Sequence, residues 1–124
     1  MSPQRPVFLD IPKLRFPVMA IVSILHRITG VILFLYVPFM LYLLSTSLAS
    51  PHSFYDLKIW MHLPWIAFLL WVMLSALACH VFAGIRHLLM DCGFAEHVCA
   101  ARVSAYTVLG FTAISVVALG AWVW

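Results

Sequence analysis

The chain has 124 residues, of which 65% are hydrophobic and only 9% charged, and its mean hydropathy is +1.09. A soluble domain is about 45–50% apolar and about 25% charged, so the extra apolar side chains need lipid around them. The net charge is +3, but the seven Lys and Arg residues are too few and too scattered for a phosphate-binding surface. The composition therefore excludes a soluble domain and a nucleic-acid-binding protein, and it predicts an all-α membrane protein.

Three long stretches contain no Asp, Glu, Lys or Arg, namely residues 28–55, 59–85 and 103–124. A bilayer core about 30 Å thick is crossed by roughly 20 apolar residues in helical form. We therefore predict one transmembrane anchor domain over residues 1–124. It has a cytoplasmic N-terminal segment at 1–21 and three transmembrane helices at about 22–48, 61–89 and 102–124.

The positions of the basic residues predict the orientation of this domain. Six of them precede the first helix, lie near its start or flank the second loop: Arg5, Lys13, Arg15, Arg27, Arg86 and Arg102. Only Lys58 lies in the first loop. Because cytoplasmic loops are enriched in Lys and Arg, the N-terminus and the second loop are predicted to be cytoplasmic. Four tryptophans gather toward the opposite interface, as in an aromatic belt: Trp60, Trp65, Trp122 and Trp124.

The first predicted helix carries a polar stripe within the stretch SILHRITG. Ser23, Arg27 and Gly30 have the spacing i, i+4, i+7 and share one face, and His26 lies beside that face. An arginine inside a membrane keeps its charge and needs an anion, a carbonyl oxygen or water. Ser23 and Arg27 are therefore candidate ligands of a quinone headgroup, and Arg27 and His26 are candidate contacts of a haem propionate. The alternative is a snorkelling arginine beside a serine at the helix start.

The second predicted helix carries His80, Gly84 and His87 on one face. His80 lies nine residues before Leu89, roughly 13 Å from the predicted end of the helix. Gly84 removes side-chain bulk beside it, so a flat ligand could approach there, as an axial haem histidine requires. The alternative is a histidine that only hydrogen-bonds to another helix. Arg86 and His87 lie near the interface, where we expect snorkelling or phosphate contact.

The chain supplies only one histidine at such depth, so a haem iron with two axial ligands would need a second ligand from a partner chain. The three cysteines, Cys79, Cys92 and Cys99, form no CxxC pair and no CxxCH motif. Their pattern argues against a disulfide scaffold and against covalent haem attachment.

Three motifs together resemble the cytochrome b556 subunits of succinate dehydrogenase, which are the C subunits of the membrane anchor of respiratory complex II. The motifs are RPVFLD near the N-terminus, SILHRITG in the first helix and HVFAGIRHLLMDCG in the second. RPVFLD is the form typical of proteobacterial enzymes. The likeness covers most of the chain, including its length and its three-helix topology.

This resemblance implies a role for each matching residue. His80 matches the axial ligand of haem b, Ser23 and Arg27 match the quinone-site residues, and His26 matches the histidine near a haem propionate. His87 matches a histidine that does not ligate iron. The resemblance also implies one haem b shared with a second small anchor subunit that supplies the other ligand, and a helical bundle formed with that subunit.

The implied complex is a tricarboxylic acid cycle enzyme of the bacterial inner membrane. A flavoprotein subunit oxidises succinate, an iron–sulfur subunit passes the electrons on, and ubiquinone is the substrate reduced at the anchor. Two alternatives remain open. One is the anchor of a quinol:fumarate reductase, and the other is a structural anchor without a cofactor. A transporter subunit is disfavoured, because the predicted spans place no acidic residue at membrane depth.

Overall fold

The structure, a computed structural model, describes residues 16–94 and 97–124. All regular elements in these ranges are helices: α1 (Val18–Ala49), α2 (Pro51–Met61), α3 (Pro64–Asp91) and α4 (Val98–Val123). The helices α1, α3 and α4 are long and apolar enough to cross a membrane. The predicted all-α fold with three spanning helices is confirmed, and each predicted helix end lies within four residues of the observed one. Most of the predicted N-terminal segment, including RPVFLD, lies outside the described residues.

A further helix, α2, occupies the predicted first loop. Ser50 caps α2, since its hydroxyl accepts a hydrogen bond from the Ser53 amide at 3.1 Å while the Ser53 hydroxyl accepts one from the Ser50 amide at 3.0 Å. Pro51 occupies the first turn, where no amide donor is needed. Pro64 lies in the first turn of α3 in the same way, so each of these two prolines lies at the start of a helix.

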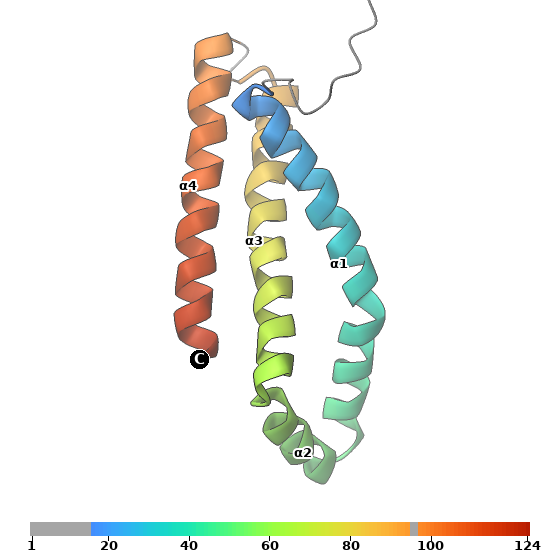
Figure 1. The fold of residues 1–124 in the computed structure, drawn as a ribbon. Helices are drawn as coiled ribbons and strands as arrows, with labels where there is room; N and C mark the ends of the chain where they lie inside the picture. Colours follow the sequence, from blue (N-terminus) through green and yellow to red (C-terminus); the bar gives the residue numbers. More distant parts are fainter. Residues whose placement is uncertain (1–15, 95–96) are drawn as a thin grey trace, which may run out of the picture.

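Helix α3 lies in the middle of the bundle, with α4 on one side and α1 on the other (Figure 1). Helix α1 meets α4 only near its N-terminal end and diverges from it toward α2. Small residues line the buried face of α3, including Ala76 and Ala83, and Ala101 and Ala105 do the same on α4. Small side chains let helix backbones approach closely in a membrane, where packing replaces the hydrophobic effect between helices.

The core lies at the end of the bundle where all three long helices meet. Val22 of α1, Ala83 of α3, and Ala105 and Val108 of α4 form one buried cluster there. Much of the remaining apolar surface of α1 and α4 is exposed, as for Phe34 at 75%. Such a surface suits lipid or a partner helix, and the shared bundle with a second subunit stays a prediction.

Candidate functional site

The predicted site residues lie where α1 crosses α3, close to the core. His26 projects from α1 and His80 from α3, and their imidazole rings are stacked with centroids 4.2 Å apart and planes 16° apart. These residues are 54 positions apart in sequence. The structure thus brings together two of the histidines that the sequence singled out, and it does so through direct ring contact between the two helices.

The Nδ1 atom of His80 is held by α1. It lies 3.1 Å from the backbone oxygen of His26 and 3.3 Å from the Oγ1 atom of Thr29. A carbonyl oxygen can only accept, so we assign the proton of the neutral ring to Nδ1. The lone pair then lies on Nε2. Metal-bound histidines typically donate the other ring N–H to a carbonyl or carboxylate in this way, so the donor chemistry of His80 fits an axial haem ligand.

Two glycines allow the rings to lie at this crossing. A Cβ atom on Gly30 would lie 3.1 Å from Cε1 of His80, and one on Gly84 would lie 3.3 Å from Nε2 of His26. The sequence predicted that the space beside Gly84 would admit a flat ligand. In the structure, the His26 imidazole lies there, so Gly84 serves the contact between α1 and α3.

His87 extends the stack, because its ring centroid is 5.0 Å from that of His26. Its Nδ1 lies 2.7 Å from the backbone oxygen of Ala83, one turn earlier on α3, and donates a hydrogen bond to it. The shared face of His80, Gly84 and His87 is confirmed, since all three adjoin His26. Three neighbouring histidines suggest a metal centre, but the described residues include no group of three or more His, Cys, Asp or Glu residues that could hold an ion.

Ser23 and Arg27 lie one turn apart on α1. Ser23 is half-buried and Arg27 is exposed. Within residues 16–94 and 97–124, no hydrogen bond or ion pair engages the Arg27 guanidinium. Both side chains therefore keep surface that a substrate or a partner chain could reach.

We expected snorkelling or phosphate contact for Arg86 near the interface, and the structure buries Arg86 instead of letting it snorkel. Its side chain is only 5% exposed and lies between α3 and α4. The Nε atom donates to the Oγ atom of Ser104 at 3.0 Å, and Nη2 donates to the backbone oxygen of Ala101 at 3.1 Å. The position of Arg86 near a helix end could not reveal that it is buried, because its burial depends on how α4 packs against α3.

Thr29 is a site residue that the sequence reasoning missed. It is 7% exposed, and its hydroxyl lies 2.8 Å from the backbone oxygen of Leu25 and 3.0 Å from that of His26. Since the single hydroxyl proton of Thr29 is donated to these carbonyls, Oγ1 accepts a hydrogen bond from the Nδ1–H of His80. One signal was present, because Thr29 follows Val22 by seven residues and so shares the face that α1 turns toward the core.

Comparison with known proteins agrees with this architecture. Residues 1–119 match the family of succinate dehydrogenase/fumarate reductase transmembrane subunits. The chain belongs to this family. It is also 52% identical, over the full length of both chains, to the succinate dehydrogenase cytochrome b556 subunit of Coxiella burnetii (strain RSA 493 / Nine Mile phase I). The resemblance predicted from the three motifs is therefore confirmed.

Membership of the transmembrane subunit family and the three spanning helices together establish a multi-pass membrane protein. The family description covers both succinate dehydrogenases and fumarate reductases. A transporter subunit is thereby set aside.

Proposed function

We propose that the chain is the membrane-anchoring cytochrome b subunit of a bacterial succinate:ubiquinone oxidoreductase. It anchors the flavoprotein and iron–sulfur subunits, shares one haem b with a second small anchor, and contributes to the ubiquinone site. The observation that carries this proposal is the hydrogen bond from His80 Nδ1 to the His26 carbonyl, which leaves Nε2 as the nitrogen able to bind iron. The cytochrome name of the Coxiella relative supports the same assignment.

In this proposal, His80 would hold the iron of haem b through Nε2, and the second anchor would supply another ligand. When bound, the haem provides a one-electron redox centre within the membrane. His26 and Arg27 would bind its propionates from α1. The chain's own contribution is to fix the orientation of the His80 ring through the His26 carbonyl and Thr29, and to exclude water with the core beside it.

Ser23 and Arg27 bind the quinone headgroup from the exposed side of α1. Reduction of a quinone to a quinol takes up two electrons and two protons, and negative charge develops on the carbonyl oxygens during this process. A guanidinium and a hydroxyl donor in a low-dielectric site stabilise that charge. The electrons come from the iron–sulfur subunit, and the protons come from the cytoplasmic side.

The haem assignment is tested with the whole complex by a reduced-minus-oxidised visible spectrum. His80→Ala should remove or shift the α-band of the b-type haem. His87→Ala is the matched control, because His87 lies on the same face of α3, also stacks on His26 and also donates Nδ1–H to a carbonyl. A spectrum that changes in His87→Ala and not in His80→Ala would show that the proposal assigns the haem ligand to the wrong histidine.

The quinone assignment is tested by separating two activities of the same complex. Arg27→Ala should lower succinate-dependent quinone reduction by about 100-fold, the typical loss when a donor that stabilises developing negative charge is removed. Succinate oxidation with a soluble electron acceptor should persist, because that reaction does not use the membrane site. Arg102→Ala, at an exposed arginine on α4, is the control and should change neither activity. Equal loss of both activities in Arg27→Ala would contradict the assignment.

The reverse reaction, fumarate reduction by a quinol, is the second candidate because the family description includes it. The name of the 52% identical relative favours the succinate-oxidising direction. Assays of the complex with ubiquinone and with menaquinol distinguish the two. Faster turnover with menaquinol and fumarate would support the second candidate.

A further inference from the structure

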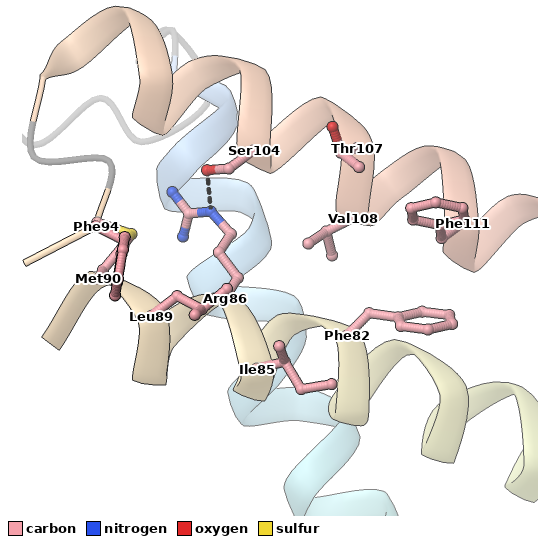
Figure 2. Close-up of a pocket in the computed structure, with 10 residues that line it drawn as sticks. All are labelled: Phe82, Ile85, Arg86, Leu89, Met90, Phe94, Ser104, Thr107, Val108 and Phe111. Carbon is pink, nitrogen blue, oxygen red and sulfur yellow. Dashed lines mark hydrogen bonds between the residues drawn. The ribbon is translucent and has the colours of Figure 1, made fainter. Parts of the chain in front are cut away.

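A groove of about 450 Å³ runs between α3 and α4 at the end of the bundle that carries the α3–α4 connection (Figure 2). This volume falls in the range of about 300–1,000 Å³ typical of small-molecule sites. The walls are almost entirely apolar and include Phe82 and Leu89 of α3 and Phe111 of α4. The described part of the chain thus presents a long apolar groove that neither the haem nor the quinone assignment uses.

The end of α3 shapes one end of this groove. Gly93 has a φ of 85°, which glycine adopts readily, and its amide donates to the backbone oxygen of Met90 at 3.0 Å. The amide of Phe94 donates to the oxygen of Leu89 at 2.9 Å. This pair of bonds is a Schellman motif, which ends the helix and turns the chain back over its last turn. As a result, Phe94 becomes part of the groove wall.

Arg86 lines the groove at the same end and is the one charged residue among the described residues that line it. Its two hydrogen-bond acceptors, Ser104 Oγ and the Ala101 carbonyl, are neutral. Among residues 16–94 and 97–124, no carboxylate forms an ion pair with it. A buried cation without a counter-charge is costly, and arginine retains its charge in proteins. Arg86 also has N–H donors that these two bonds do not use. An anionic group in the groove would balance its charge.

The charge and the apolar walls lie at different depths. Arg86 is five residues before the end of α3 at Asp91, about 7.5 Å along the helix, which is close to the headgroup level. Phe82 lies one turn deeper on α3, and Phe111 is seven residues beyond Ser104 on α4, about 10 Å deeper. Figure 2 shows the guanidinium beside Ser104 and the two phenylalanines farther along the groove. The groove is therefore charged at the headgroup level and apolar within the hydrocarbon.

We propose that this groove binds one anionic phospholipid, with its phosphate on Arg86 and an acyl chain along Phe82 and Phe111. A phospholipid matches this arrangement along the membrane normal, because its anionic headgroup lies at the interface and its hydrocarbon chains lie below it. A quinone headgroup is neutral and leaves the Arg86 charge uncompensated. The site is separate from the His26–His80 contact, so it does not depend on the haem or quinone assignments.

The test uses the whole detergent-purified complex and native mass spectrometry, which counts bound lipids by mass. After delipidation, the complex is offered phosphatidylglycerol or phosphatidylcholine with identical acyl chains. The wild type should retain one phosphatidylglycerol with about fivefold preference, the usual contribution of one basic residue near anionic lipid. Arg86→Gln should abolish the preference, and Arg102→Gln, at an exposed arginine of α4, should keep it.

A second pair of variants leaves Arg86 intact and therefore decides the question even if Arg86→Gln fails to assemble. Thr107 lines the groove and is exposed, so Thr107→Trp should fill it and lower phosphatidylglycerol retention. Val103→Trp, on the exposed surface of α4 outside the groove, should not. Equal retention of the two lipids by the wild type would overturn the proposal. So would unchanged retention in Thr107→Trp, because the lipid would then bind elsewhere or a partner helix would fill the groove.

Discussion

Thr29 offers a direct test of how α1 controls the proposed haem ligand. Thr29→Val keeps the branching and nearly the size of the side chain and replaces the hydroxyl with a methyl group. The carbonyls of Leu25 and His26 that the hydroxyl contacts also accept amide bonds within α1, so no buried acceptor is left without a partner. Because the site is only 7% exposed, the added methyl group is buried. We therefore expect the complex to assemble at close to wild-type levels.

The effect should instead appear in the midpoint potential of the haem. His80 Nδ1 loses its 3.3 Å contact with Thr29 and keeps the 3.1 Å bond to the His26 carbonyl. A hydrogen bond from the second ring nitrogen makes a histidine a more basic ligand, which favours the oxidised iron. Its partial loss should raise the potential. One interhelical hydrogen bond in a membrane contributes about 0.6 kcal/mol, which corresponds to a shift of at most about 25 mV for one electron.

Potentiometric titration of the purified complex, followed at the haem α-band, measures this shift. Thr107→Val is the matched control, because Thr107 also bonds to a carbonyl one turn earlier, at 3.0 Å, but lies on α4 away from His80. An unchanged or lowered potential in Thr29→Val would refute the reasoning. An equal rise in Thr107→Val would also refute it, because the effect would then come from hydroxyl loss in general.

Two further predictions concern packing and capping. Gly84→Ala should stabilise the complex less than Gly110→Ala, or destabilise it. Both substitutions gain up to about 1 kcal/mol of helix propensity. Only at Gly84 does the new Cβ atom meet a neighbour, because it would lie 3.3 Å from Nε2 of His26. Thermal melting of the complex measures the difference in stability between the two variants. Ser50→Ala should cost α2 about 1 kcal/mol through loss of its cap, seen as faster amide hydrogen exchange in α2 alone. Ser47→Ala, at a serine that caps no helix, should leave that exchange unchanged.

Features that depend on local pattern were predictable from the sequence. The spanning helices followed from the length of the uncharged stretches, because about 20 apolar residues in a row have few stable alternatives to a membrane helix. The shared face of His80 and His87 followed from helical periodicity alone. The start of α2 also had a local signal, since Ser50 followed by Pro51 is a typical helix start.

Features that depend on contacts between helices were not predictable in the same way. Arg86 and Arg102 both lie near the predicted second loop, yet Arg86 is buried and Arg102 is exposed. What separates them is the rotation of α3, which points Arg86 at Ser104 and the carbonyls of α4. A one-dimensional pattern gives the position of a residue along its own helix, but not which neighbouring helix its side chain meets.

The sequence by itself determined that this protein is a three-span membrane helix bundle of the succinate dehydrogenase/fumarate reductase anchor family, and it identified the histidines and arginines that give the chain its chemistry. The tertiary structure decided how those side chains are used. It stacked His26 on His80, turned the Nδ1–H of His80 to the α1 backbone and placed Arg86 at the end of an apolar groove. The physical reason is that helix formation depends on local hydrogen bonds and lipid solvation, whereas a ligand site depends on where two separate helices cross.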